Sequence, residues 1–200
     1  MADRLVNALN YGVPQERERV ILFGIKGNIL QKKIEAFGWD KFQKYTDEEI
    51  LKCAWTKEEP FQKESKKEFP EGVLQDLTPE YWFLKNDTEH HPNAEDFLIP
   101  RAGLQKMRII PEGDVKHKSY KRLPRFRYSP TACYGNNEVH LHPYKERRLS
   151  VSEVLALQSM PKEFVLPPDM TLTKKFKTAG NGVPFLLSEG IAKTIKDFLE

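Results

Sequence analysis

Two arginines and a glutamine alternate near the amino terminus, just before a short apolar run. The stretch YGVPQERER occupies residues 11–19, so its polar side chains include Gln15, Arg17 and Arg19. A guanidinium group presents several N–H donors in a fixed fork, which suits it to hold a carbonyl or phosphate oxygen. The alternative is that Arg17 and Arg19 are solvated charges that guard the start of a strand.

A second polar cluster lies in the last quarter of the chain, where residues 180–184 read GNGVP. Glycine lets a ligand approach the backbone closely and permits unusual backbone angles. An asparagine between two glycines is also common in a simple turn. The pattern therefore indicates either one wall of a ligand site or a turn, and it predicts a helix after Pro184.

Basic charge is concentrated in residues 101–148. This block carries twelve Lys and Arg against four Asp and Glu, whereas residues 41–100 carry eight against fourteen. Aromatic side chains are interleaved with the basic ones, as in surfaces that meet phosphates. The alternative is a solvated basic face. The candidates for contact with nucleic acid, at phosphates or at guanine edges, are Lys118, Lys121, Arg122, Arg125 and Arg127.

Histidines occur as a pair at 90–91 and as an H-x-H at 140–142, but the two cysteines, Cys53 and Cys133, are isolated. Because a structural zinc site normally needs spaced cysteines, we expect no metal. Two cysteines also exclude a disulfide framework, which favours the reducing cytoplasm. No run approaches the roughly 18 apolar residues of a membrane span, and no secretory leader is evident.

Apolar periodicity predicts the elements that position these residues. Residues 20–25 read VILFGI, which predicts a strand buried on both faces, as in a parallel sheet. Residues 41–67 suit a charged surface helix that is broken by Pro60. Residues 72–124 are dense in proline and glycine, which predicts loops and short strands.

Two helices are predicted in the last quarter. Ser150 and Glu153 have the S-x-x-E spacing of a capping box, so a helix should run from Val151 to about Ser159 and end before Pro161. The final helix carries one apolar stripe that must be buried against another element, formed by Leu187, Ile191, Ile195 and Phe198.

Three stretches, in this order, resemble motifs of the DNA (cytosine-5) methyltransferases. Residues 11–19 look like the Q-x-R-x-R motif, residues 147–161 are similar to the next motif, and residues 180–184 resemble the last. The chain departs from the usual pattern at Ser152, where arginine is common, and at Gly182, where serine or alanine is common. The resemblance implies the carboxyl-terminal part of such an enzyme, as in the smaller subunit of a split enzyme or a truncated copy.

The same resemblance implies an α/β fold in three parts. Residues 1–26 would be a piece of the catalytic domain, and residues 27–148 would be a target-recognition domain of strands, loops and short helices. Residues 149–200 would be helices that return to the catalytic domain. The first and last parts would then complete a partner's Rossmann-like methyltransferase domain, and the stripe of the final helix would be exposed without that partner.

The activity implied is transfer of a methyl group from S-adenosylmethionine to C5 of a flipped cytosine in double-stranded DNA. The resemblance assigns Gln15, Arg17 and Arg19 to the flipped-base pocket and Thr131 to a phosphate of the target strand. It assigns Asn181, Gly182 and Val183 to the cofactor pocket.

The 200 residues hold no F-x-G-x-G cofactor loop, no Pro-Cys nucleophile and no Glu-Asn-Val acid. We therefore expect the chain to be inactive alone and to need a catalytic amino-terminal subunit that carries these motifs. Such an enzyme would be cytoplasmic and associated with the nucleoid, with or without a restriction partner. The alternative is a non-catalytic, sequence-specific DNA-binding module or an inactive remnant of the family.

Overall fold

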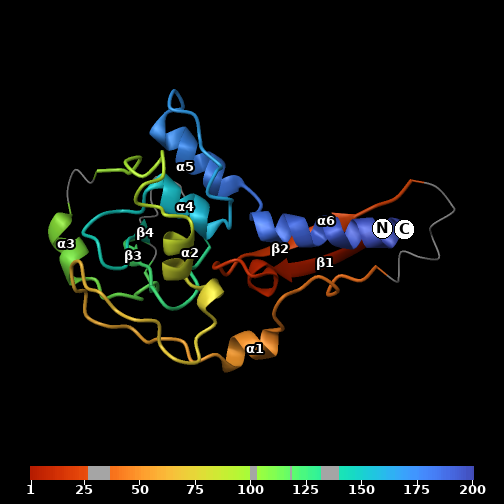
Figure 1. Cartoon of the computed structure of the whole chain (residues 1–200), viewed down its shortest axis with the longest axis horizontal. Helices are drawn as coiled ribbons and strands as arrows, with labels where there is room; N and C mark the ends of the chain where they lie inside the picture. The colour runs from red at the N-terminus through yellow and green to blue at the C-terminus, as the bar shows by residue number, and fades with distance from the viewer. Residues whose placement is uncertain (27–36, 100–102, 118, 132–139) are drawn as a thin grey trace.

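A computed structural model describes residues 1–26, 37–99, 103–117, 119–131 and 140–200. The molecule has two parts that lie side by side (Figure 1). One is an elongated unit made of a two-stranded ribbon and the last helix, and the other is a wider unit of short helices and long loops. The amino and carboxyl termini lie next to each other at the far end of the elongated unit.

The ribbon consists of β1 (Ala2–Asn7) and β2 (Glu18–Phe23), which pair antiparallel with Ala2 opposite Phe23. A 3-10 turn, η1 (Ala8–Tyr11), follows β1, and Gly12 closes it with a φ of 84°. That positive φ favours glycine because a side chain would be strained there. The connection between the two strands therefore folds back tightly and carries the segment that begins at Gln15.

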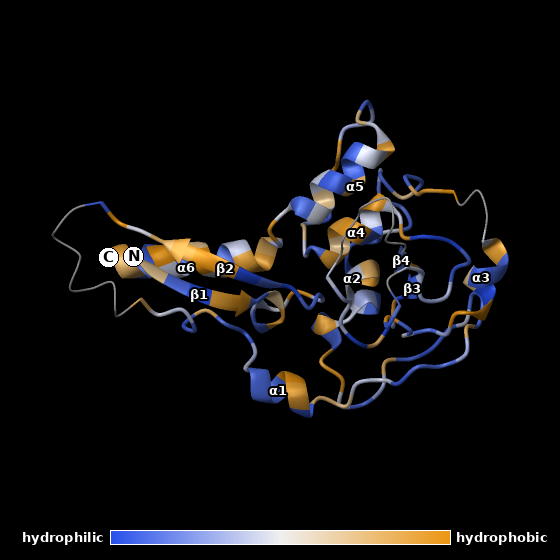
Figure 2. Ribbon diagram, turned by 180° about the vertical axis from the view of Figure 1, so that it is seen from behind, coloured by the Kyte–Doolittle hydropathy of each residue, from blue (hydrophilic) through white to orange (hydrophobic). Residues whose placement is uncertain are grey.

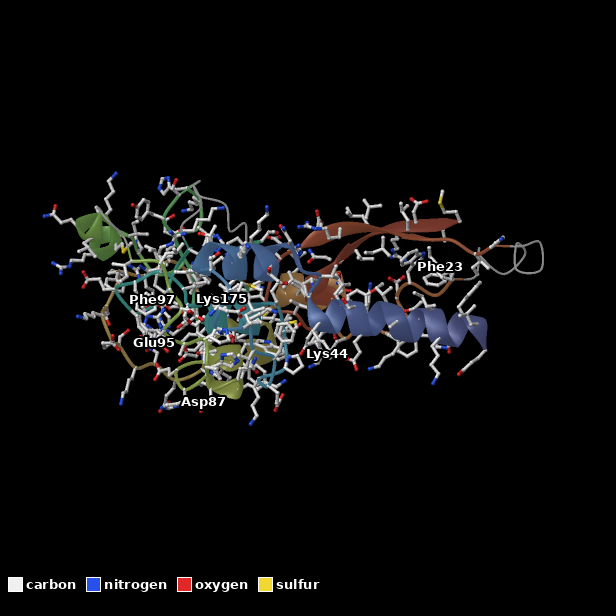
Figure 3. The ribbon with its side chains drawn as sticks, turned by 90° about the horizontal axis from the view of Figure 1, so that it is seen from above. Phe23, Lys44, Asp87, Glu95, Phe97 and Lys175 are labelled. Atoms are coloured by element: carbon white, nitrogen blue, oxygen red, sulfur yellow. The ribbon has the colours of Figure 1, made fainter. Side chains whose placement is uncertain are left out.

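Helix α6 (Phe185–Leu199) covers one face of the ribbon. Figure 3 shows Phe23 directed between the strands and this helix, where its ring stacks on Phe37 at 4.5 Å and meets Phe198 edge-on at 5.6 Å. The predicted apolar stripe packs here, in a cluster that includes Val6, Ile21, Leu187, Ile191, Ile195 and Phe198. The prediction that the stripe is exposed is therefore wrong, because the chain's own first residues cover it.

The prediction of a parallel strand buried on both faces is also wrong. Side chains of a strand alternate between its faces, and α6 covers only the face that carries Ile21 and Phe23. Leu5, Val20 and Leu22 point the other way and are 57%, 62% and 65% exposed. Figure 2 shows that most of β2 has the colour of hydrophobic residues. An apolar run thus lies in a ribbon that has one open face.

The wider unit holds the remaining elements, and together with the ribbon they make a mixed α/β fold. It contains α1 (Asp47–Lys52), the 3-10 turn η4 (Gln75–Leu77), α2 (Pro79–Lys85), α3 (Leu104–Ile109), the parallel pair β3 (Lys121–Arg122) and β4 (His140–Leu141), α4 (Val151–Leu157) and α5 (Leu172–Asn181). In place of the helix predicted over 41–67 and broken by Pro60, the capping box of Thr46 and Glu49 starts one short helix, which ends at Lys52 with Cys53 as its C-cap. No described helix has the length and apolar character to cross a membrane.

Helices α4 and α5 share one core with α2. Trp82 and Phe83 of α2 pack with Val154 and Leu157 of α4 and with Phe176 of α5. A partly buried ion pair adds to this packing, because Nζ of Lys175, which Figure 3 labels on α5, lies 2.7 Å from the carboxylate of Asp96. The sequence predicts no helix between Pro161 and residues 180–184, so α5 is an element that the sequence interpretation missed.

Helix α4 begins as predicted. The Ser150 hydroxyl accepts a bond from the Glu153 amide, and the Glu153 carboxylate accepts one from the Ser150 amide, which confirms the capping box. The helix ends at Leu157, with Gln158 as its C-cap, and Ser159 then adopts a φ of 51°. The chain leaves α4 through this sharp turn rather than continuing to Pro161.

Candidate functional site

The segment from Pro14 to Arg17 lies against residues 129–131. The Glu16 amide donates to the Ser129 carbonyl at 2.8 Å, and the Ser129 amide donates to the Pro14 carbonyl at 2.9 Å. The Thr131 hydroxyl donates to the Glu16 carbonyl at 2.6 Å. The structure thus brings together two segments that the sequence interpretation named separately, the Q-x-R-x-R stretch and Thr131.

Gln15 and Ser129 face each other in this contact as partners of a parallel bridge. Both are fully buried, yet neither the Gln15 carboxamide nor the Ser129 hydroxyl has a hydrogen-bond partner among the described residues. A buried polar group without a partner is costly, so such groups normally meet water, a ligand or another segment. Ser129 was not named from the sequence, and no local pattern marks it.

Arg17 joins this segment to the GNGVP turn. Its side chain is 4% exposed, and its Nη2 donates to the carbonyls of Gly180 and Gly182, both at 3.2 Å. Its amide donates to the Asn7 side chain. Two motifs more than 160 residues apart in the chain therefore meet through one guanidinium group.

Arg19 differs from Arg17 because it is exposed on the ribbon, opposite Val6 in the register. Its Nη1 donates to the neighbouring Glu18 carbonyl at 2.5 Å. The remaining donors of this guanidinium face solvent, so Arg19 is the arginine of the stretch that can reach a ligand without rearrangement.

The residues expected at the cofactor site lie between α5 and α6. Asn181 ends α5 and is exposed, and Val183 is 52% exposed. Phe185, which the sequence interpretation did not name, is 40% exposed beside them. An amide next to two apolar side chains suits one wall of a site for a purine and its polar edge. Gly182 has an ordinary φ of −60°, so it does not adopt the unusual backbone angles that a glycine would permit here.

The prediction that Arg122 and Arg125 contact DNA is wrong, because both side chains are buried inside the wider unit. Arg122 donates to the carbonyls of Met107, Ile110 and His142, and its guanidinium lies 3.7 Å from the Phe61 ring centre. Burial lowers the pKa of Arg122 to about 10. Arg125 is 1% exposed and binds Glu112 with Nε and Nη2 at 2.9 Å. These arginines hold loops together.

Several other described cations of the basic block are also paired with carboxylates within the protein. The pairs are Arg108 with Glu146, Lys116 with Glu58, Lys145 with Glu89 and Arg147 with Glu153. Lys118 lies outside the described residues. Lys121 is half-buried, and Arg127 is exposed and stacks over Tyr128 at 5.0 Å. The composition therefore predicts a larger free basic surface than the structure shows. Arg127 is the clearest remaining candidate for contact with DNA.

The two histidines of the H-x-H stretch, His140 and His142, are buried in the core. His142 accepts bonds at Nδ1 from the amides of Tyr144 and Lys145, and its Nε2 lies 3.3 Å from the Glu153 carboxylate. Burial lowers the pKa of His142, and it lowers the pKa of His140 to about 4, so both rings are neutral at pH 7. Across the described ranges, no three His, Cys, Asp or Glu side chains gather as metal ligands.

Glu153 is the centre of a buried charge network. Arg147 donates to both of its carboxylate oxygens, at 2.8 and 2.7 Å. Burial alone would raise the pKa of Glu153, but the Arg147 guanidinium, together with a hydrogen bond from the neutral His142 ring, outweighs burial and holds it well below its usual range. The network fixes the start of α4 and thereby the position of the turn at Gln158 and Ser159.

Comparison with known proteins gives a family match over almost the whole chain. The family model described as C-5 cytosine-specific DNA methylase matches residues 2–197. The type II methyltransferase M.NmeDI of Neisseria meningitidis serogroup C is 52% identical over 99% of this chain and 46% of its own length. M.BspRI of Lysinibacillus sphaericus is 31% identical over 98% of this chain and 43% of its own. M.HgiDII of Herpetosiphon aurantiacus is 26% identical over 98% and 55%.

These matches correct one expectation. The family model runs through the stretch between the three motifs as well as through the motifs themselves. The chain spans about half the length of the curated relatives it matches, and that share does not assign it to one end of them. The identification of the chain as the carboxyl-terminal part of a split or truncated enzyme is therefore wrong.

Proposed function

Because this chain belongs to the family of C-5 cytosine-specific DNA methylases, we propose that it takes part in methyl transfer from S-adenosylmethionine to C5 of a cytosine in double-stranded DNA. Its role in this reaction is to bind the DNA around the flipped base and to form one wall of the cofactor site. The observation that carries the proposal is the meeting of three segments, residues 14–19, 129–131 and 180–185. The type II relatives support a role in DNA modification alongside a restriction enzyme.

The reaction needs groups that these 200 residues do not carry. In this chemistry a cysteine thiolate attacks C6 of the extruded cytosine while a carboxylic acid protonates N3. Neither cysteine follows a proline, and the Cys53 sulfur accepts a bond from the Leu74 amide within a loop. We infer that a segment carrying the Pro-Cys and Glu-Asn-Val motifs, called the completing segment below, supplies both groups.

We assign the parts of the chain accordingly, with residues 1–26 and 149–200 in the catalytic domain and 27–148 as the target-recognition domain. The packing of α6 on the ribbon supports the first assignment. The open ribbon face formed by Leu5, Val20 and Leu22 suits contact with the completing segment, since an exposed apolar face of this kind usually marks an interface. That contact would extend the ribbon into the larger Rossmann-like sheet.

S-adenosylmethionine supplies the methyl group when bound. Asn181 would hold its polar edge, Gly182 would let it approach the backbone, and Val183 with Phe185 would cover its ring. Gln15 and Ser129 are fully buried, so they would line the flipped-base pocket only if the residues that cover them moved, and their buried polar atoms would then gain partners. Thr131 already donates its proton to Glu16, so its hydroxyl would meet a phosphate only if that bond were exchanged.

Arg19→Ala tests the proposed pocket. In the enzyme joined by its completing segment, labelled methyl transfer to duplex DNA should fall by roughly ten- to a hundredfold in kcat/KM, since a bond from a charged donor is lost. Duplex affinity should change less than about twofold, because phosphate contacts elsewhere persist.

The matched control is Arg4→Ala, which removes another surface arginine of the same ribbon that pairs with Asp40. It should leave methyl transfer near the wild-type rate. Equal losses of transfer and duplex affinity in Arg19→Ala would exclude the pocket role. No transfer by the wild-type enzyme with its completing segment would favour a DNA-binding module.

Arg127→Gln tests whether Arg127 belongs to the surface that binds DNA. Each phosphate contact contributes about one unit to the slope of log affinity against log salt. We expect the variant to bind duplex DNA more weakly at low salt, with a slope shallower by about one unit. Lys162→Gln, at an exposed position in another loop, is the control and should keep the wild-type slope. An unchanged slope in Arg127→Gln would remove this residue from the DNA surface.

A further inference from the structure

We propose that Arg17 is a positioning residue that ties the DNA-binding segment to the cofactor wall, rather than a ligand of DNA. The inference rests on the proposed function and concerns how its two sites communicate. It predicts that occupancy of one site alters binding at the other through the backbone of residues 180–185.

The contacts of Arg17 carry the first step. The side chain is 4% exposed, so a phosphate could not reach it without displacing the residues that cover it. Its Nη2 donates to the carbonyls on both sides of Asn181, at 3.2 Å each. A planar guanidinium can donate in two directions at once, which fixes the separation and orientation of those two carbonyls. The exposed Asn181 side chain is thereby held between two anchored peptide groups.

The end of α4 holds the same turn from its other side. The Phe185 amide donates to the Gln158 carbonyl at 2.9 Å, and the Leu186 amide donates to the Ser159 hydroxyl at 3.1 Å. These are among the first amides of α6, whose N-cap Pro184 offers no side-chain bond. The turn is therefore clamped between Arg17 and Ser159, and only its outward side chains are left for a ligand.

Arg17 is connected equally directly to the segment that is proposed to bind DNA. Glu16, the residue before Arg17, bonds to Ser129 through its amide and to Thr131 through its carbonyl. When a bound phosphate or base displaces residues 129–131, Glu16 must move with them. That displacement is transmitted through one peptide bond to Arg17 and from Arg17 to the turn at residues 180–185. Coupling of this kind is reciprocal, so a bound cofactor must alter DNA affinity by the same factor.

Arg17→Lys tests the clamp, with Arg19→Lys as the matched variant in the same motif. In the 200-residue chain, hydrogen exchange of the amides in residues 182–186 should become at least tenfold faster in Arg17→Lys and stay unchanged in Arg19→Lys. In the enzyme joined by its completing segment, Arg17→Lys should weaken S-adenosylhomocysteine about tenfold. It should also abolish the effect of duplex DNA on that affinity, while the salt slope of duplex binding stays the same.

Ser159→Ala is the second variant, because it loosens the other side of the clamp without changing charge. It should accelerate exchange in the same amides and weaken S-adenosylhomocysteine, which keeps the test valid if Arg17→Lys does not fold. Unchanged exchange and unchanged cofactor affinity in Arg17→Lys would overturn the inference. Failure of the wild-type enzyme to bind S-adenosylhomocysteine would instead refute the proposed function, whereas the exchange measurement would still decide the clamp.

Discussion

Replacing Glu153 by glutamine is expected to lower the free energy of unfolding by about 3–5 kcal/mol. The carboxylate side chain is 2% exposed and accepts bonds from the Arg147 guanidinium, the Ser150 amide and His142. Glutamine has the same size but no charge, and its NH2 group would face other donors. The variant therefore leaves the largely buried Arg147 cation without its counter-ion, which costs more than the loss of one hydrogen bond.

Glu49→Gln is the matched control for this change. Glu49 and Thr46 form the same capping box at the start of α1, but that box is exposed and lacks an arginine partner. We expect its substitution to cost a small fraction of the loss at Glu153, as measured by urea unfolding at pH 7. Similar losses at both positions would show that helix capping, not the buried ion pair, is what Glu153 contributes.

The pH dependence follows from the same carboxylate. The folded state lowers the pKa of Glu153, so its contribution is complete above the pKa of the unfolded chain and declines as the pH falls. With an unfolded value of about 4.3, the difference between wild type and Glu153→Gln should be constant from pH 7 to 5 and narrow below about pH 4. A difference that stays constant down to pH 3 would contradict this assignment.

Gly190→Ala is expected to cost about 3 kcal/mol of stability, despite the better helix propensity of alanine. A Cβ atom at this position of α6 would lie 2.3 and 2.6 Å from two ring carbons of Tyr11. The Tyr11 ring is 4% exposed, and its hydroxyl is held by the Trp39 carbonyl at 3.1 Å, so it has little freedom to move. The helix and the turn that leads to Gln15 would be forced apart.

Thermal or urea unfolding of three further variants separates the clash from other effects. Gly24→Ala, where an added Cβ has open space, should change stability little. Tyr11→Ala should be destabilising by itself, and adding Gly190→Ala to it should cost nothing more, because the clash is gone. A stabilised Gly190→Ala protein would mean that Tyr11 can leave its position freely.

The features that the sequence predicted well depend on residues close together in the chain. The capping box of Ser150 and Glu153 and the helix after Pro184 are set by neighbours three or four positions away. The candidate residues Arg17 and Asn181 were also recognisable singly. Their meeting was not, because it depends on how a chain of more than 160 residues returns to its start.

The predictions that were wrong concern residues whose surroundings come from distant parts of the chain. Arg122 and Arg125 were predicted to contact DNA because basic residues cluster around them in the sequence, but distant carbonyls and Glu112 provide buried partners for them. Val20 and Ile21 look alike in sequence, although one faces solvent and the other faces α6. In each case the environment comes from a segment far along the chain, which a local pattern does not contain.

The neighbouring termini have a consequence for how the protein is made. The inner ribbon face of Val6, Ile21 and Phe23 is covered by residues 187–198. A ribosome that adds about 5–20 residues per second needs roughly ten to thirty seconds between the two segments. During this interval the two strands have no helix to pack on, and the nascent chain is open to aggregation or chaperones. The elongated unit, whose strands are made before the wider unit, is therefore the last part of these 200 residues to acquire its core.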